Sequence, residues 1–284
     1  MKTLRKFFVA FLCLVSLAAF SDEKDKVLRV CADPNNLPLS HKNKQGYENK
    51  IAELIAKDLG WTVEYAWFPQ RMGFIRNTLR ARDPETNRWK CDLVTGVSPD
   101  SDMTSNTKPY YRSTYALAYV KGKGLDSVQT PEDLATLPPE RLKSLKIGVV
   151  ARTPPVDWLL KNNLFDQAVP YQMQTGDPEQ YLGQIVEKDL AGGKIDAAII
   201  WGPMAGYFAK KSSVPMAVVP LKSEGDLKMD YGIAMGMRRG EKEFKQQIES
   251  ALEKNKPAIK QILTEYGVPL VDEPKPEQGL KSRD

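Results

Sequence analysis

The sequence VLRVCADPNNLPLSHKNKQGYENKIAELIAKDLGWTVEYAW, residues 27–67, decides the fold. It begins with a β-branched run that stops at Asp33, where the prolines and asparagines of DPNNLP favour a loop. Apolar residues at helical spacing follow and end at Gly60, and TVEYAW returns to the alternation of a strand. This order predicts a βαβ unit of a parallel sheet, in which ligands bind beyond the carboxyl ends of the strands. The loop from Asp33 to Ser40 is therefore a candidate binding site.

The same pattern recurs along the rest of the chain. We expect strands in CDLVTGV, STYALAYV, LKIGVV, KIDAAIIWGP, VPMAVVPL and DYGIAMGMR, with helices between them. One helix is expected to begin after Thr153 as N-cap, and another at Asp177. This alternation predicts an α/β fold.

The strand order predicts two α/β lobes around a hinged cleft. The chain is expected to cross between them near residues 118–123 and 219–224, and the glycines of KGKG, residues 121–124, are typical of a hinge. The predicted division assigns residues 27–119 and 223–268 to the first lobe and 120–222 to the second. Residues 269–284 are charged and rich in proline, and we expect them to form a flexible tail.

The first 21 residues have the three regions of a secretory signal peptide. Basic residues precede the apolar run FFVAFLCLVSLAAF, and a small-x-small site ends at Ser21, where we expect cleavage. A lipoprotein anchor at Cys13 is the alternative, but Leu12 stands where that anchor requires a small residue. No second run reaches membrane length. We therefore predict a soluble exported protein, which is periplasmic if the source is a Gram-negative bacterium.

The charge of the chain excludes one class of partner. The formal charge of +5 includes three cations of the leader, so the remaining chain carries 38 basic and 36 acidic groups. Nucleic-acid binding requires a concentrated basic face, and this overall balance gives no case for a nucleic-acid partner. Cys31 and Cys91 remain after cleavage, and an even number in an oxidising compartment suggests a disulfide. Two buried free thiols are the alternative, because in parallel strands the two cysteines would lie at opposite ends.

Several long motifs resemble a known family. The segments LRVCADPNNLPLS, GYENKIAELIAKDLG, DLVTGV and KIDAAIIWGPMAGYFA resemble type II periplasmic solute-binding proteins, the receptors of ABC importers, over residues 27–268. CADPNNLPLS, PQRMGFIRNTLRA, CDLVTGV and IIWGPMAGYFA resemble one branch more closely. This is the MxaJ/XoxJ type of accessory protein, which is associated with quinoprotein alcohol dehydrogenases of methanol oxidation.

This resemblance implies a function without catalysis. The expected partner is a PQQ-dependent methanol dehydrogenase of the calcium or lanthanide type, which the chain would bind to assist its maturation or activation. Its cytochrome c is a further candidate partner. The resemblance also implies that the chain holds no cofactor itself. From its residues we expect neither a bound metal nor an enzyme, and we expect a monomer.

Two departures from the amino-acid receptors bear on the ligand. Those receptors bind the ligand carboxylate with an arginine shortly after the DLVTG strand, where this chain has Asp100 and Asp102. They bind the ammonium with an aspartate at the end of a strand of the second lobe, where this chain has Trp201 and Gly202. An unpaired buried charge costs several kcal/mol. We therefore expect no free amino acid as ligand.

The candidate residues for the cleft or for partner binding come from the ends of the predicted strands. They are Asp33, Asn35, Asn36, Arg71, Thr107, Tyr110, Tyr111, Arg112, Arg152, Thr153, Trp201 and Gly202. Tyr and Arg carry much of the binding energy of protein interfaces. Each candidate has an alternative role: the Asp33 loop as a turn, Tyr110 in the core, and Trp201 as a plug of the cleft. Arg71, Arg76, Arg80 and Arg82 form either a solvated face or a docking surface for an acidic protein.

Catalytic motifs are sparse. The single histidine, His41, lies in the loop SHKNK and is predicted to be a surface residue, and no His or Cys cluster has the spacing of metal ligands. Two alternatives stay open. One is an ABC-importer receptor for a ligand other than an amino acid. The other is an enzyme such as a dehydratase, which would need a cleft carboxylate with a raised pKa.

Overall fold

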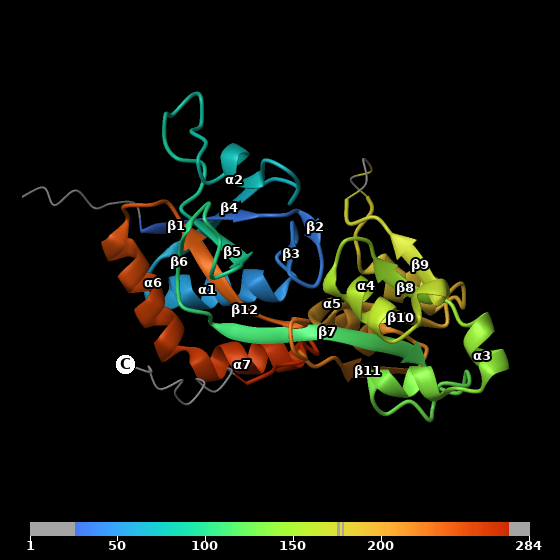
Figure 1. The fold of residues 1–284 in the computed structure, drawn as a ribbon. Coiled ribbons are helices and arrows are strands. Elements are labelled where there is room, and N and C mark those ends of the chain that lie inside the picture. The colour runs from blue at the N-terminus through green and yellow to red at the C-terminus, as the bar shows by residue number, and fades with distance from the viewer. Residues whose placement is uncertain (1–25, 175–176, 178, 273–284) are drawn as a thin grey trace, which may run out of the picture.

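The computed structural model describes residues 26–174, 177 and 179–272 of the chain (Figure 1). The predicted signal peptide, its cleavage site and Cys13 lie outside the described residues, as do residues 273–284 of the predicted tail. Within the described part of the chain, no helix has both the length and the apolar character needed to cross a bilayer.

The predicted βαβ unit is confirmed. Strand β1 (Val27–Ala32) runs parallel to β4 (Thr62–Trp67), with Val27 opposite Thr62 and Ala32 opposite Trp67. Helix α1 (Tyr47–Asp58) connects them and buries Ile51 and Ile55, because its apolar stripe faces the sheet. Strand β5 (Leu93–Val97) pairs in parallel with the other edge of β1. The carboxyl ends of these strands point to the loops that follow Ala32 and Trp67.

The first lobe is the part of the molecule built on β1, β4, β5 and β12 (Asp230–Met237). Its apolar core lies between this sheet and helices α1, α6 (Lys242–Lys254) and α7 (Lys256–Glu265). The remaining elements of this lobe are β2 (Asn35–Asn36), β3 (Ser40–His41), α2 (Phe74–Asn77) and β6 (Ser105–Asn106). Helices α6 and α7 come late in the sequence, so the end of the chain completes the first lobe (Figure 1).

The second lobe is the part built on β8 to β11. Its strands are β8 (Ile147–Val150), β9 (Ala168–Tyr171), β10 (Ala197–Trp201) and β11 (Met216–Pro220). Its helices are α3 (Pro139–Ser144), α4 (Pro154–Lys161) and α5 (Gly202–Lys211), with 3₁₀ turns at Pro131–Thr136 and Phe165–Gln167. Two apolar clusters, one on each face of this sheet, form its core. The α/β class predicted from the sequence is confirmed.

The prediction that a helix begins at Asp177 is wrong. Only Ile185–Leu190 is helical, as a single π-helical segment. Asp177 Oδ1 accepts a hydrogen bond from the backbone N–H of Glu179 over 2.9 Å, and its carbonyl accepts from Gln180. This side chain therefore closes a local turn, which competes with helix formation.

Strand β7 (Tyr111–Val120) belongs to both lobes (Figure 1). Residues Tyr111 to Thr114 pair with β12, whereas Tyr115 and the residues after it pair with β10 and β11. Thr114 Oγ1 lies 2.7 Å from the carbonyl oxygen of Leu221, where the chain returns from the second lobe. The sheet partners thus change at Thr114, and the lobe boundary at residues 119–120 stays a prediction.

The hinge predicted at residues 121–124 is wrong. Lys121 N–H donates to the Pro215 carbonyl, and Gly122 N–H donates to the carboxylate of Asp126. All these groups lie in the second lobe. The two glycines, with φ of 76° and 84°, form the turn after β7, because a left-handed backbone suits a tight turn as well as a hinge.

The predicted flexible tail needs correction at its start. Ser113 Oγ donates to the carbonyl of Pro269 over 2.7 Å, and Val271 N–H donates to the carbonyl of Arg112 over 3.1 Å. Ser113 and Leu270 form an antiparallel bridge. Residues 269–271 are therefore bound to β7, because they supply hydrogen-bond partners for the free edge at this strand.

Candidate functional site

A cavity of about 710 Å³ lies between the two lobes. The loops after β1 and β4 form the wall of the first lobe, and the segments around β9 and the π-helical turn form the opposite wall. Four residues predicted for the cleft line this cavity, and they are Asp33, Asn35, Asn36 and Arg71. The carboxyl ends of β1 and β4 therefore lead into the cleft, as the βαβ pattern predicts.

Asp33 shapes the first wall rather than presenting a free carboxylate. Its Oδ1 accepts the backbone N–H of Asn35 over 2.8 Å, and its Oδ2 accepts the N–H of Gln70 over 2.6 Å. Asn36 Nδ2 donates to Gln70 Oε1 over 3.1 Å. The carboxylate thereby joins the loop after β1 to the loop after β4.

Arg71 spans the mouth of the cleft. Its guanidinium donates to the carbonyl of Asp177 in the second lobe over 3.3 Å. An exposed hydrogen bond of this kind adds little stability. It nevertheless shows that the two walls approach each other closely in this conformation.

The second wall is rich in side-chain amides and has one carboxylate, which is bound by neighbouring side chains. Gln172, Gln174, Gln180 and Gln184 line it. Asp189 accepts the Tyr171 hydroxyl over 2.6 Å and pairs with Lys194 over 3.0 Å. Burial alone would raise the pKa of Asp189, but these two donors lower it overall. Both cleft aspartates are thus bound by groups of the chain itself.

Trp201 does not line this cavity, although its position at the end of β10 suggested a plug. Its ring packs edge-on against Tyr115 at 5.4 Å and against Tyr231 at 6.2 Å between ring centroids. Gly202 is buried, and a Cβ there would lie 2.2 Å from the carbonyl oxygen of Thr114. Glycine is required at this position for the close packing of α5 against β7.

The candidates for partner binding between residues 107 and 112 lie mainly in the interior. They are Thr107, Tyr110, Tyr111 and Arg112. Tyr110 and Tyr111 are 8% and 7% exposed and belong to the core of the first lobe. Thr107 Oγ1 accepts the backbone N–H of Met235 over 3.0 Å. Arg112 forms an ion pair with Asp230 over 2.6 Å. None of the four is among the residues that line the cavity.

Arg152 and Thr153 lie at the start of α4 and also do not line the cavity. Thr153 Oγ1 donates to the carbonyl of Val150 over 2.6 Å, so Thr153 holds the N-cap position without a side-chain capping bond. Arg152 is exposed and has a φ of 62°.

Glu48 is a buried carboxylate that the sequence analysis missed. It lies in the first turn of α1 and is 2% exposed. Burial raises its pKa to about 7, although hydrogen bonds from Tyr110, Tyr111 and Thr95 act in the opposite direction. Glu48 precedes Ile51 and Ile55 by three and seven residues, so its place on the apolar stripe was a readable signal.

Glu48 does not line the cleft. Its side chain is almost fully buried, and a Cβ at Gly96 would lie 3.9 Å both from its Oε1 and from the side chain of Leu39. It therefore lacks the access that a catalytic carboxylate requires. His41 accepts a hydrogen bond from its own loop, at Asn43 N–H, and within the described residues no group of three or more His, Cys, Asp or Glu is placed to hold a metal.

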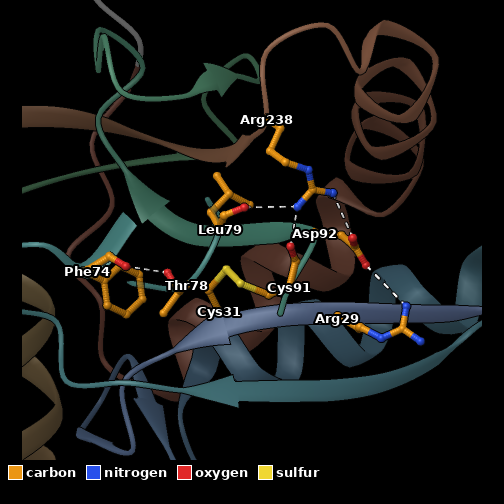
Figure 2. Close-up of a disulfide and its surroundings, with 8 residues drawn as sticks. All are labelled: Arg29, Cys31, Phe74, Thr78, Leu79, Cys91, Asp92 and Arg238. Carbon is orange, nitrogen blue, oxygen red and sulfur yellow. Dashed lines mark hydrogen bonds and ion pairs between the residues drawn. A yellow bond between two sulfur atoms is a disulfide. The ribbon is translucent and has the colours of Figure 1, made fainter. Parts of the chain in front are cut away.

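Cys31 and Cys91 form a disulfide with Cα atoms 5.4 Å apart (Figure 2). The two cysteines do not lie at opposite ends of paired strands. Cys91 comes before β5, and the chain bends at Asp92, between Cys91 and the start of this strand. The sulfurs are buried against Phe74, Leu79 and Val94. The bond therefore attaches the segment between β4 and β5 to the first strand.

Arg238 holds the same segment from the other side (Figure 2). Its guanidinium donates to the carbonyls of Leu79 and Cys91 and pairs with Asp92 over 2.9 Å. The side chain is only 12% exposed. Hydrogen bonds to a charged group are the strong ones, so this segment is fixed at its base.

Comparisons with known proteins place the chain among periplasmic binding proteins. No protein-family model matches it. The crystal structure of the periplasmic binding protein XoxJ from Methylobacterium extorquens AM1 has a TM-score of 0.69 and 37% identity, covering 87% of this chain and 100% of that one. Protein MoxJ of Methylorubrum extorquens is 29% identical over 259 residues, 86% of this chain and 81% of that protein.

A more distant likeness concerns the fold alone. An ancestral cationic amino acid solute-binding protein has a TM-score of 0.62 and 19% identity, covering 85% of this chain and 96% of that one. Its ligand class is a property of that protein. The two aspartates of the present cleft are engaged by the chain itself, as described above.

Proposed function

Since this chain belongs to the MxaJ/XoxJ family of periplasmic binding proteins, we propose that it is an accessory protein of a PQQ-dependent methanol dehydrogenase. It binds the dehydrogenase in the periplasm and assists its maturation or activation. The similarity to XoxJ at 37% identity over nearly the whole described chain carries this proposal. The type II periplasmic binding protein fold implied by the sequence is confirmed by the same likeness and by that to the ancestral receptor.

The state of the cleft supports a role other than the transport of zwitterions. Receptors of that kind need a guanidinium and a carboxylate that are free for the ligand. Here Asp33 accepts two backbone N–H groups, and Asp189 is bound by Tyr171 and Lys194. A small charged ligand would have to displace these bonds, which costs binding energy.

The cleft residues enter the proposal as part of the partner-facing surface. We assign Asp33, Asn35, Asn36 and Arg71 to the rim that the dehydrogenase contacts, and Tyr110, Tyr111 and Thr107 to the support of that lobe. The chain acts as a monomer, holds no cofactor, and performs no catalysis. The capture experiment that tests for the dehydrogenase also tests for its cytochrome c, which would co-purify if it takes part.

The experiment is capture of the dehydrogenase from periplasmic extract of the source organism with the tagged, purified chain. Methanol dehydrogenase should co-purify, identified by mass spectrometry and by its activity. Deletion of the gene should lower methanol dehydrogenase activity, and the chain supplied in trans should restore it. If the dehydrogenase neither co-purifies nor loses activity on deletion, the accessory role is wrong.

Thermal unfolding with a metabolite library separates this role from that of a solute receptor. A ligand at a hundredfold its dissociation constant stabilises a receptor by about 2.7 kcal/mol. We expect no such gain with free amino acids. A gain of this size with any small molecule of the library would favour the receptor role.

A further inference from the structure

The positive charge of the described chain is concentrated in one segment. Residues 71–90, between β4 and β5, contain six basic and two acidic side chains. Residues 26–272 carry 34 basic and 30 acidic side chains, so the rest of that range has 28 of each. We call residues 71–90 the arginine segment, because five of its six basic residues are arginines. The whole excess of positive charge over residues 26–272 therefore lies in twenty residues.

Three arginines of this segment, Arg76, Arg80 and Arg82, have no carboxylate partner within the described residues. Within the described residues, the guanidinium of Arg76 makes no hydrogen bond or ion pair, and that of Arg80 donates only to the backbone carbonyl of Met103 over 2.6 Å. Arg82 donates to the carbonyl of Asn87 and stacks on the ring of Trp89 at 4.0 Å. All three of these arginines are exposed.

Four arginines elsewhere in the structure behave differently, although Arg239, like Arg80, donates to a backbone carbonyl. Arg29, Arg112, Arg141 and Arg238 each pair with a carboxylate of the chain. Such pairs are internal to the fold. The guanidinium groups of Arg76, Arg80 and Arg82 are instead available for carboxylates of another molecule, to which they can bind in bidentate geometry.

Exposed methionines lie beside these arginines. Met72 is 93% exposed and Met103 52% exposed, and the bond from Arg80 to the Met103 carbonyl holds the two segments together. Methionine and arginine are enriched in protein interfaces, whereas charges alone are typical of solvated faces. Asp100 and Asp102 are exposed near Met103 and limit the basic area on that side.

The arginine segment has a rigid base. Phe74 and Leu79 are buried beside the disulfide, and Arg238 donates to the Leu79 carbonyl (Figure 2). Thr78 Oγ1 donates to the Phe74 carbonyl over 2.6 Å. A surface that is ordered before binding loses less conformational entropy in the complex. The segment is thus built as a fixed outward face of the first lobe, above β4 (Figure 1).

We propose that the arginine segment is the docking surface through which the chain binds an acidic patch on its partner dehydrogenase. This inference rests on the proposed function and adds a second contact face, which shares Arg71 with the cleft rim, together with its chemistry. Arg76, Arg80 and Arg82 bind carboxylates of the partner, and Met72 contributes apolar contact. Because rim charges act mainly on encounter, they set the association rate and its dependence on salt.

The test uses the full mature chain and the purified methanol dehydrogenase of the same organism. Association rates are measured by surface plasmon resonance at low and at physiological ionic strength. The variant Arg76→Glu/Arg80→Glu should lower the association rate by about tenfold or more at low salt. The variant Arg76→Lys/Arg80→Lys keeps the charge and should retain most of the rate.

Lys121→Glu/Lys123→Glu is the matched control, because it makes the same change of charge in an exposed turn of the second lobe. It should change the rate less than about twofold. Equal effects of both reversals would overturn the docking surface while leaving the accessory role intact. Absence of binding by the wild-type chain would overturn both. Circular dichroism melting of each variant checks that it folds.

Vesicles containing phosphatidylglycerol test the competing class of partner. A basic surface can also bind anionic lipid. We expect no binding that depends on Arg76 and Arg80. If the reversal abolishes vesicle binding and leaves the dehydrogenase rate unchanged, the arginine segment faces a membrane and the proposal is wrong.

Discussion

Tyr110 donates its hydroxyl to Oε2 of Glu48 over 2.5 Å, in the core of the first lobe. Tyr111 lies at 3.4 Å from the other carboxylate oxygen and 2.8 Å from the hydroxyl of Tyr47. The buried carboxylate thus joins α1 to the start of β7, the strand that both lobes share. Because burial outweighs these hydrogen bonds, the pKa of Glu48 rises to about 7.

The stability of the protein should depend on pH through Glu48. A carboxyl whose pKa is raised in the folded state stabilises fully below its unfolded value, and this contribution is lost as the pH rises through the folded value. Between the ordinary pKa of 4.5 and about 7, the free energy of unfolding should therefore fall by roughly 3 kcal/mol. Glu48→Gln should remove most of this fall. Urea unfolding at pH 5 and pH 8 measures it.

Glu53→Gln is the control for this prediction. Glu53 lies on the same helix, but its side chain is 36% exposed and pairs with Lys50 at 3.9 Å. Its replacement should leave the pH dependence of the wild type unchanged. A Glu48→Gln variant that loses stability between pH 5 and pH 8 as steeply as the wild type would contradict the assignment.

Tyr110→Phe should cost more at pH 8 than at pH 5. Hydrogen bonds to a charged group contribute about 1.5–3 kcal/mol, against about 0.5–1.5 for neutral pairs. At pH 8 the Tyr110 hydroxyl serves an ionised carboxylate. Tyr119→Phe is matched, because the Tyr119 hydroxyl donates to the neutral carbonyl of Val128 over 2.8 Å in a buried site. Its cost should be the same at both pH values, and equal pH dependence in the two variants would refute the prediction.

Removal of the disulfide should destabilise the arginine segment first. Cys31→Ala/Cys91→Ala opens a loop of 60 residues and should lower the free energy of unfolding by about 2–4 kcal/mol. Trypsin should then cleave after arginines of residues 76–88 faster than in the wild type. Reductant should shift the melting temperature of the wild type only. Unchanged cleavage in the variant would show that Arg238 alone suffices to hold the segment.

Gly206→Ala should be strongly destabilising although alanine favours a helix. A Cβ at Gly206 would lie 1.8 Å from the carbonyl oxygen of Gly267, so α5 would have to move away from the end of α7. We expect a loss of about 2 kcal/mol or more, since overpacking costs about 1–3 kcal/mol. Gly193→Ala meets no atom within 4 Å and pays only for its φ of 74°. Thermal melting of the two variants should rank Gly206→Ala as the less stable.

Local patterns in the sequence identified most of the helices and strands but not the side chains against which they pack. The stripe of Ile51 and Ile55 and the end at Gly60 predicted α1, because a helix that covers a sheet must repeat its apolar positions. The Asp33 loop was placed in the cleft for the same reason: parallel strands leave their following loops at one edge. These inferences depend on neighbours in sequence only.

The failures concern residues whose role is set by distant parts of the chain. Tyr110 was a candidate for partner binding, with the core as the alternative, and it is buried against Glu48. Trp201 was a candidate for the cleft, but it packs against Tyr115. Gly122 and Gly124 suit a turn and a hinge equally, and only the pairing of β7 distinguishes the two. The phase of Glu48 on α1 could have been read, whereas its tyrosine partners lie more than sixty residues away.

The meeting of Thr114 with Leu221 gives the second lobe the topology of a domain insertion. The chain leaves the first lobe at Thr114 and returns to it at Leu221, and Thr114 Oγ1 donates to the Leu221 carbonyl over 2.7 Å. Each lobe has an apolar core of its own. A short bridge between these two points should therefore allow excision of the intervening segment. The first lobe would then remain as a smaller protein that keeps residues 71–90. A deletion of the gene segment between the two points would thus separate one lobe from the other.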